Sequence, residues 1–313
     1  MDILITCLLF ALGIAFIVKG GDTFVDAASW IAKALHIPTF IIGATIVSLA
    51  TTLPEMIVSL IAAMEGKTDM AVGNAVGSVT ANTALIMATA MLAMSVACSR
   101  KQYWKQILLL IAAATVLLLS CRSGELSNLG SMILAAIFVL FMVQNVVSAK
   151  MSSKGSHDRE TVDRSQLSKN VILFLLGAAA IVVGSRLMVN NGSAIAAWLG
   201  VPERIIAVTL IAVGTSLPEL VTTITAIIKK ESALSIGNII GANIIDLSLI
   251  LPLCSLASGE ALPVSAQSIA VDLPVCLLVT LVAALPLLIF QKANKWQGII
   301  LLGLYAGYLA LVI

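Results

Sequence analysis

Long apolar segments with almost no charged residues constrain the fold of this chain more than any other feature of its sequence. A helix needs about 20 such residues to cross a bilayer, and about ten segments meet that rule. Their apolar runs are continuous rather than alternating, which argues against a β-barrel. The sequence therefore predicts an all-α membrane protein with ten transmembrane helices. The expected spans lie near residues 2–19, 38–64, 70–97, 104–120, 128–148, 169–187, 202–228, 233–257, 268–290 and 295–313, and residues 20–37 could extend the first one.

The composition supports this prediction, because 60% of the 313 residues are apolar and only 11% are charged. With a mean hydropathy of +1.08, the chain has too little charge to cover the surface of a soluble domain of this size. No basic patch suggests nucleic acid. The five scattered cysteines are expected to be small apolar residues within helices. The N-terminus lacks a basic region and a cleavage site before Lys19, so the first apolar segment is expected to remain in the protein.

The placement of Lys and Arg predicts the orientation in the membrane. With the N-terminus outside, 14 of the 18 basic residues fall in cytoplasmic loops. The other four, which fall outside, are Lys67, Arg122, Arg186 and Arg204. The opposite orientation would invert this ratio. We therefore expect a multi-pass protein of the cell membrane with both termini outside.

The two halves of the chain repeat each other at an offset of 164 residues. Thr-Thr-Leu-Pro-Glu at 51–55 recurs as Thr-Ser-Leu-Pro-Glu at 215–219, and Gly-Asn at 73–74 recurs at 237–238. A hydrophilic stretch separates the halves, which predicts a first five-helix repeat at 1–148, a cytoplasmic linker at 149–168 and a second five-helix repeat at 169–313. Because each repeat has an odd number of helices, the two are inverted, and a binding site is expected at their interface near the membrane midplane.

Three acidic residues lie within the predicted spans: Glu55, Glu219 and Asp246. A carboxylate at the centre of a membrane helix costs about 2.5–3.5 kcal/mol on insertion scales, so each one needs a partner. The spans that hold these acids contain no Lys or Arg except Arg204, near the start of 202–228. Either the acids are protonated or a bound cation supplies the charge. Two carboxylates with neutral oxygens suit calcium, which takes 6–8 oxygen ligands.

Neutral oxygens are expected beside both glutamates. Pro54 has no N–H, so the carbonyl of Ala50 loses its helical partner, and Pro218 does the same to Gly214. Within a membrane such carbonyls need another partner, which a cation can provide. The hydroxyls in the same turns belong to Thr51, Thr52, Thr215 and Ser216. A simple proline kink is the alternative, but two copies, each followed by Glu, favour a site.

The predicted third and eighth helices carry a second pair of related patterns. Gly73 and Gly77, like Gly237 and Gly241, are spaced for close helix packing. A polar face follows in each helix, because side chains four residues apart share one side. These faces consist of Asn74, Ser78 and Asn82 in one half and Asn238, Ala242 and Asp246 in the other. Asn74 and Asn238 could also serve only in helix packing, whereas Asn82 and Asp246 are expected to be ligands or their neighbours.

The repeated T-[TS]-L-P-E and G-N-x-x-G motifs and the five-plus-five layout resemble the cation/calcium exchanger superfamily, and prokaryotic sodium/calcium exchangers in particular. The resemblance covers nearly the whole chain. It implies one central calcium site flanked by sodium sites, with no cofactor beyond the transported ions. The ligands that it implies are Glu55, Thr51, Thr52, Ser78, Asn82, Glu219, Thr215, Ser216 and Asp246, with the backbone carbonyls of Ser48 and Ala212.

The chain also departs from the family pattern. Ala242 stands where the family usually has Ser, which weakens one sodium site, and Val79 stands where it has Asn. Potassium-dependent relatives have an acid at the position of Asp246, so potassium coupling stays open. Proton-coupled relatives place an acid where this chain has Gly77 and Gly241, which argues against that coupling.

We expect a sodium/calcium antiporter that exports calcium by alternating access and works as a monomer in the lipid bilayer. A potassium-coupled or proton-coupled calcium/cation antiporter is the alternative within transport. A passive channel and an intramembrane enzyme are weaker alternatives. The acids lack a His–Glu metal motif and a G-x-G-D-like pattern, so no catalytic residue is predicted.

Overall fold

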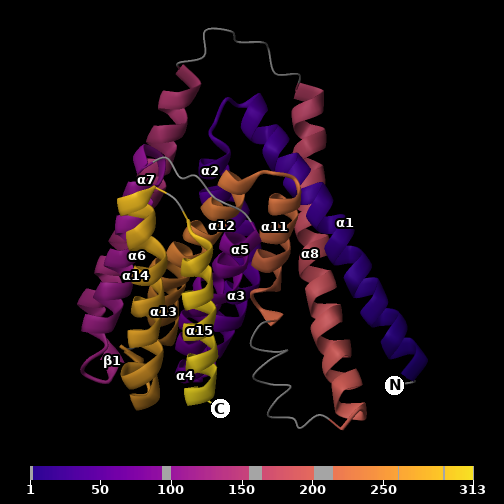
Figure 1. Cartoon of the computed structure of the whole chain (residues 1–313). Helices are drawn as coiled ribbons and strands as arrows, with labels where there is room; N and C mark the ends of the chain where they lie inside the picture. The colour runs from indigo at the N-terminus through magenta and orange to yellow at the C-terminus, as the bar shows by residue number, and fades with distance from the viewer. Residues whose placement is uncertain are drawn as a thin grey trace.

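The computed structural model describes residues 3–93, 100–154, 164–200, 214–259, 261–291 and 293–312. These residues are helical almost throughout, as predicted, and both termini lie at the same end of the helix bundle (Figure 1). Two short strands, β1 (Glu125–Leu126) and β2 (Leu262–Pro263), pair antiparallel at that end and join the two repeats.

Each repeat begins with a very long helix and continues through helices that contain π-helical turns, labelled η. The first repeat consists of α1 (Ile3–Ala34), α2 (Thr39–Ile42), η1 (Gly43–Val47), α3 (Ser48–Met64), α4 (Thr68–Ala81), η2 (Asn82–Met87), α5 (Ala88–Ala93), α6 (Arg100–Ser120) and α7 (Asn128–Lys154). The second consists of α8 (Arg164–Trp198), α11 (Leu217–Ile228), α12 (Ser232–Ile245), η4 (Asp246–Ile250), α13 (Leu251–Ser258), η5 (Ser268–Asp272), α14 (Leu273–Phe290) and α15 (Lys295–Val312).

Nine helical segments of the described chain are long and apolar enough to cross a membrane. The remaining predicted span, 202–228, is described only from Gly214 onward, where it forms the apolar helix α11. Residues 20–34 extend the first helix, as the sequence suggested. Helices α7 and α8 reach Lys154 and Arg164, inside the predicted linker, whose other residues lie outside the described chain.

The repeat is also visible in the backbone. Helices α1 and α8 end at Ala34 and Trp198, 164 residues apart. The turns that follow each contain a left-handed residue at matching positions, His36 with φ 54° and Gly200 with φ 79°. Gly66 and Lys230, with φ 75° and 61°, form a second matched pair after α3 and α11. The same local conformations therefore recur at the offset that the sequence motifs define.

The long helices α1 and α8 lie side by side along one flank of the molecule (Figure 1). Glycines at matching positions allow their backbones to touch. A Cβ atom on Gly13 would lie 2.9 Å from the carbonyl oxygen of Gly184, and one on Gly184 would lie 2.8 Å from that of Gly13. Gly20 and Gly177 form the same kind of contact one to two turns along. Such backbone contact makes the two helices a closely packed pair.

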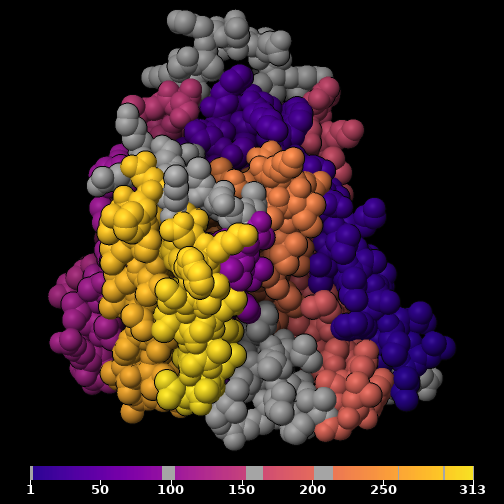
Figure 2. All heavy atoms as spheres, viewed as in Figure 1, coloured from indigo at the N-terminus to yellow at the C-terminus, as the bar shows by residue number. Residues whose placement is uncertain are grey.

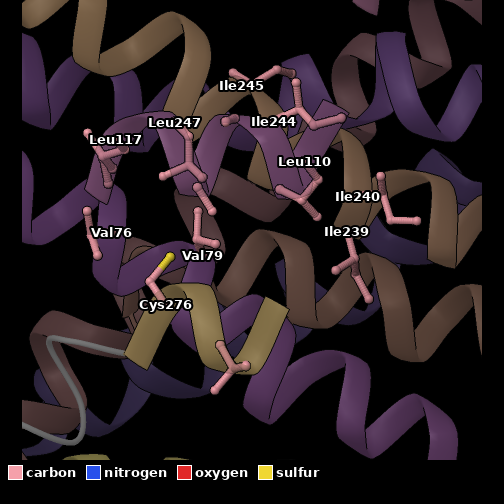
Figure 3. Close-up of a cluster of buried hydrophobic side chains, with 14 of the residues drawn as sticks. Val76, Val79, Leu110, Leu117, Ile239, Ile240, Ile244, Ile245, Leu247 and Cys276 are labelled. Atoms are coloured by element: carbon pink, nitrogen blue, oxygen red, sulfur yellow. The ribbon is translucent and has the colours of Figure 1, made fainter. Parts of the chain in front are cut away.

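The remaining helices enclose a large apolar core that both repeats build. Val76 and Val79 of α4 and Ile244 and Ile245 of α12 belong to this cluster, part of which Figure 3 shows. On the face shown in Figure 2, α14 and α15 cover one side of the bundle and α1 covers the opposite edge. The interface between the repeats is therefore tightly packed at the level of the polar site described below.

Among the described residues, the close approach that the glycine pairs predict is formed by the pair in the second repeat. A Cβ on Gly237 would collide with the carbonyl oxygen of Phe40, and one on Gly241 with that of Ala44, so α12 packs directly against α2 and η1. Gly73 and Gly77 of α4 have no described atom within 4 Å of such a Cβ. The segment of the second repeat that corresponds to α2 and η1, 203–211, lies outside the described residues. The contact predicted for Gly73 and Gly77 therefore stays a prediction.

A proline in α14 shows how this chain normally satisfies a freed carbonyl. Pro286 cannot donate to the carbonyl of Val282, which lies four residues earlier. The side-chain amide of Gln297 in α15 donates to the carbonyl oxygens of Val282 and Ala283, at 2.9 and 2.8 Å. A buried side chain from a neighbouring helix therefore completes the backbone hydrogen bonding within the membrane.

Candidate cation-binding site

The three acidic residues within the spans lie together at the interface of the repeats. Glu55 in α3, Glu219 in α11 and Asp246 in η4 are each at most 1% exposed. Glu55 is close enough to Glu219 and Asp246 for their charges to interact, and so is Asp246 to Glu219. None of the ion pairs in the described chain involves these residues. Arg204, the one basic residue in the predicted spans that hold these acids, lies outside the described residues.

The carboxyl groups also lack most of the hydrogen-bond partners that buried oxygens usually have. Both oxygens of Glu55, both of Asp246 and Oε2 of Glu219 have no partner within the described chain. The same is true of three neutral oxygens from the predicted ligand set, those of Ser78, Asn82 and Ser216. A cluster of buried acceptors without donors is what an oxygen-coordinated cation would satisfy.

Threonines of α3 connect the two repeats at this site. The hydroxyl of Thr52 donates to Oε1 of Glu219 at 3.5 Å and to the carbonyl of Ser48 at 2.5 Å. The hydroxyl of Thr51 lies 3.2 Å from both Oδ1 of Asn238 and the Ser48 carbonyl. The structure thus brings Thr51, Thr52 and Ser48 from the predicted ligand set together with Glu219.

The side chain of Asn74 serves in helix packing, the alternative that the sequence left open for it. Its side-chain amide donates to the backbone carbonyl of Glu55 at 3.2 Å and to the hydroxyl of Ser59 at 2.9 Å, which ties α4 to α3. Asn238 accepts from Thr51 and is buried, so it contacts a predicted ligand. Asn74 therefore positions the helix that carries Glu55.

A feature that the sequence did not reveal is the local helix type beside the site. Asn82 is the first residue of the π-helical turn η2, and Asp246 is the first residue of η4, at the matching place of the other repeat. Turns of this type are rare and often occur at functional sites. The hydrogen bond from Asn243 to Thr83, at 2.8 Å, joins the two helices just next to these residues.

The two prolines of the repeated motif differ in their setting. Pro54 lies inside α3, and no described side chain donates to the carbonyl of Ala50, in contrast to Val282 beside Pro286. Pro218 lies in the first turn of α11, where a missing N–H costs nothing. The first backbone hydrogen bond of that helix runs from Leu220 to Ser216, at 3.0 Å. A kink within a continuous helix is therefore described in one repeat only.

A cavity of about 160 Å³ lies directly beside the site, between α8 and the two proline-containing motifs. Its lining includes Pro54, Pro218 and the predicted ligand Thr215, which is partly exposed. Ser185 and Arg186 of α8 line the opposite wall. Thr215 and Pro218 of the second repeat's motif thus face the cavity, whereas the side chains of Glu55 and Glu219 are buried.

Ten of the eleven predicted ligands, the two glutamates included, lie in α3, α4, η2, α11 and η4 or in the turn before α11. The eleventh, Ala212, lies outside the described residues. Among the described residues, His, Cys, Asp and Glu side chains do not gather in groups of three that could hold a metal ion alone. A cation here would therefore also need the hydroxyl, amide and carbonyl oxygens.

Inverted membrane repeats with a shared, enclosed acidic site define a cation/calcium antiporter. The model of the sodium/calcium exchanger protein family matches residues 5–147 and 169–313, so this chain belongs to that family. The predicted resemblance is confirmed.

Similar proteins cover the chain almost completely. The inner membrane protein YrbG of Escherichia coli is 33% identical over 322 aligned residues, which cover 99% of this chain and 97% of YrbG. The sodium/calcium exchanger MaX1 of Methanosarcina acetivorans is 29% identical, with 99% of each chain covered. A solved structure of the sodium-calcium exchanger NCX_Mj, soaked with sodium and strontium, matches with a TM-score of 0.85 at 27% identity, again over 99% of both chains.

Proposed function

We propose that this chain exchanges sodium for calcium across the cell membrane by alternating access and exports calcium. One observation carries the proposal: Glu55, Glu219 and Asp246 are buried together beside unpartnered neutral oxygens, without a basic partner in the described chain. Two of the similar proteins, MaX1 and NCX_Mj, are named as sodium/calcium exchangers, which supports this pair of ions.

Calcium binds between Glu55 and Glu219 in this proposal, and sodium ions occupy the same carboxylates when calcium has left. The unpartnered oxygens of Ser78, Asn82 and Ser216 are suitable ligands because each is buried and available. The full proposed ligand set is Glu55, Glu219, Thr51, Thr52, Thr215, Ser216, Ser78, Asn82 and Asp246, with the carbonyls of Ser48 and Ala212.

Charge balance explains why sodium and calcium do not bind at the same time. It also explains why the protein does not change between its two access states while the site is empty. Bound cations neutralise Glu55 and Glu219, whereas an empty site leaves unpaired charge in a low-dielectric environment. Exchange of three sodium ions for one calcium ion moves one net charge per cycle and is therefore sensitive to voltage.

Asp246 keeps the alternative open. Three ionised carboxyl groups match the charge of three sodium ions, but exceed that of one calcium ion by one unit. A potassium ion or a proton bound together with calcium would restore neutrality. In that case the exchange becomes potassium-coupled or proton-coupled, and its voltage sensitivity changes.

We also propose the orientation with both termini outside the cell. Both termini lie at one end of the bundle, which agrees with an even number of crossings (Figure 1). The excess of Lys and Arg in the loops at the opposite end supports a cytoplasmic position for that end.

Calcium uptake into sodium-loaded proteoliposomes that contain the full chain tests the proposal. We expect uptake that follows the sodium gradient and stays the same when potassium or pH gradients are imposed at clamped voltage. Glu55→Gln should abolish it, while Glu125→Gln, which changes an exposed acid of β1, should not. Sodium-driven uptake by Glu55→Gln would disprove the assignment of this carboxylate.

The same vesicles discriminate the alternatives. Uptake that requires internal sodium together with potassium on the calcium side would establish potassium coupling. Uptake driven by a pH gradient alone would establish proton coupling. Calcium flux that needs no counter-ion would identify a channel.

A further inference from the structure

The two repeats carry charges of opposite sign at matching positions around the ends of α3 and α11. At the offset of 164 residues, Asp22 of α1 corresponds to Arg186 of α8, and Glu65 after α3 corresponds to Lys229 after α11. Each position is thus acidic in one repeat where its counterpart is basic in the other. The inverted symmetry then relates any contact between Asp22 and Lys229 to a contact between Arg186 and Glu65 on the other side of the membrane.

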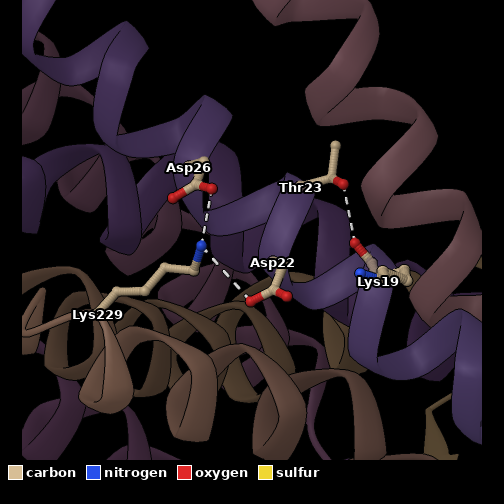
Figure 4. A network of polar contacts seen from close by, with 5 residues as sticks. All are labelled: Lys19, Asp22, Thr23, Asp26 and Lys229. Atoms are coloured by element: carbon tan, nitrogen blue, oxygen red, sulfur yellow. Dashed lines mark hydrogen bonds and ion pairs between the residues drawn. The ribbon is translucent and has the colours of Figure 1, made fainter.

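The first of these contacts is formed. Lys229 lies 2.7 Å from Oδ2 of Asp26 and 3.5 Å from Oδ1 of Asp22, and so connects α11 to α1 (Figure 4). Partial burial lowers the pKa of the Lys229 ammonium, but the hydrogen bond to Asp26 and the charges of Asp26 and Asp22 outweigh burial and raise it overall. A second ion pair, between Lys33 and Glu231 at 3.3 Å, joins α1 to the turn after α11.

The matching contact is not formed. Arg186 makes no ion pair within the described chain and lines the cavity of about 160 Å³ beside the site. Glu65 pairs instead with its near neighbour Lys67, at 2.6 Å, and both side chains are more than half exposed. The structure is therefore asymmetric: ion pairs tie α1 to α11 on one side, while the equivalent residues are apart on the side where the cavity lies.

We propose that Arg186 and Glu65 form an ion pair in the other access state, in which the contact of Lys229 with Asp22 and Asp26 is broken. The four-residue set, Asp22, Lys229, Arg186 and Glu65, selects between the two access states. This inference rests on the proposed alternating-access antiport. The residues position the helices, and none of them belongs to the proposed ligand set.

The packing of α1 and α8 makes the two contacts mutually exclusive. Backbone contact at Gly13 and Gly184 holds these helices together, so they move relative to α3 and α11 as one body. Movement that brings Arg186 of α8 toward the end of α3 carries Asp22 of α1 away from the end of α11. One ion pair then replaces the other during each transition.

Oxidative cross-linking of paired cysteines tests whether the second contact exists, independently of transport. The variant Glu65→Cys/Arg186→Cys should form a disulfide in membranes, identified by mass spectrometry to separate it from native cysteines. The variant Asp26→Cys/Lys229→Cys tests the contact that the structure contains. A matched control, Lys67→Cys/Arg186→Cys, should cross-link less because Lys67 is not the counterpart of Lys229. Failure of the Glu65–Arg186 pair to cross-link in membranes where the Asp26–Lys229 pair does would overturn the proposal.

Charge reversal tests the function of the pair. Arg186→Glu and Glu65→Arg should each change the maximal rate of exchange by about twofold to fivefold, the range expected for one exposed ion pair. The double variant Glu65→Arg/Arg186→Glu should return the rate to that of the unchanged chain. The milder Arg186→Gln and Glu65→Gln serve if a reversal prevents folding.

The two proposals fail in different ways. Without sodium-driven calcium uptake by the unchanged chain, the proposed function is wrong, and cross-linking still reports the contact. With normal uptake, single-variant effects that the double variant does not reverse would show that Arg186 acts through the cavity alone, and the proposed pair would be wrong.

Discussion

The hydroxyl of Thr52 in α3 lies 3.5 Å from Oε1 of Glu219 in α11, across the boundary between the repeats. The same hydroxyl lies only 2.5 Å from the carbonyl oxygen of Ser48. A hydroxyl has a single proton to donate, so the shorter contact takes most of it and the oxygen lone pairs remain free. Thr52 therefore couples the glutamate of one repeat to the backbone of the other.

Thr52→Val should weaken calcium binding because it removes a hydroxyl ligand and the contact to Glu219 while it keeps the shape of the side chain. A hydrogen bond of this kind contributes about 1 kcal/mol, so we expect an increase of the Kd of about fivefold in calorimetry. Thr222→Val is the control, since the hydroxyl of Thr222 bonds only to the carbonyl of Pro218, at 2.7 Å. Equal losses in both variants would contradict a specific role of Thr52.

Asp246→Asn should lower the number of sodium ions exchanged for each calcium ion. If each of the three carboxylates is neutralised by one sodium ion, a site with two carboxylates binds two sodium ions. Exchange of two sodium ions for one calcium ion moves no net charge, so calcium flux in voltage-clamped proteoliposomes then becomes independent of the membrane potential.

The matched variant moves the carboxylate instead of removing it. Asn82 occupies the position that corresponds to Asp246, so Asn82→Asp/Asp246→Asn keeps three carboxyl groups. We expect it to recover the voltage dependence. An unchanged stoichiometry in Asp246→Asn would show that this residue does not contribute charge to the load.

Gly237→Ala should destabilise the protein, because its Cβ would meet the backbone carbonyl of Phe40, which cannot move aside easily. Overpacking of this kind costs about 1–3 kcal/mol. Gly303→Ala in α15 is the control, because Gly303 is exposed, has no described neighbour within 4 Å and should tolerate a methyl group. Thermal unfolding in detergent measures both variants. Equal losses in the two would contradict a specific role of the contact between Gly237 and Phe40.

Gln297→Met should lower the thermal midpoint by about 2–4 °C. The substitution keeps the length of the side chain but removes both hydrogen bonds to α14, including the one to the carbonyl that Pro286 leaves free. Gln144→Met is the control, since the side-chain oxygen of Gln144 has no partner in the described chain. Unchanged stability of the Gln297 variant would show that this carbonyl needs no protein partner.

Much of the fold could be predicted from the sequence, because the bilayer imposes simple requirements. The length and apolarity of each segment specify the helices, and the match of residues 51–55 with 215–219 specifies the inverted repeat. The acids of the site could be predicted for the same reason, since Glu55, Glu219 and Asp246 are the costly exceptions in otherwise apolar spans.

The remaining features depend on packing that no local pattern encodes. The π-helical turns at Asn82 and Asp246 arise from an i→i+5 hydrogen-bond pattern that no sequence motif of the chain predicted. The contact of Gly237 with the backbone of Phe40 joins residues almost 200 positions apart in the sequence. The ion pairs of Asp22 and Asp26 with Lys229 likewise join residues about 200 positions apart. An asymmetric state of a symmetric repeat cannot be predicted from motifs that are themselves repeated.

The opposite charges at matching positions also bear on the origin of the chain. A dimer of two first repeats would bring Asp22 of one copy toward Glu65 of the other, and a dimer of two second repeats would bring Arg186 toward Lys229. Both assemblies would suffer repulsion between like charges, whereas one copy of each repeat offers an attractive pair in each of the two proposed access states. The charges at these positions therefore favour the pairing of unlike halves over the pairing of like ones.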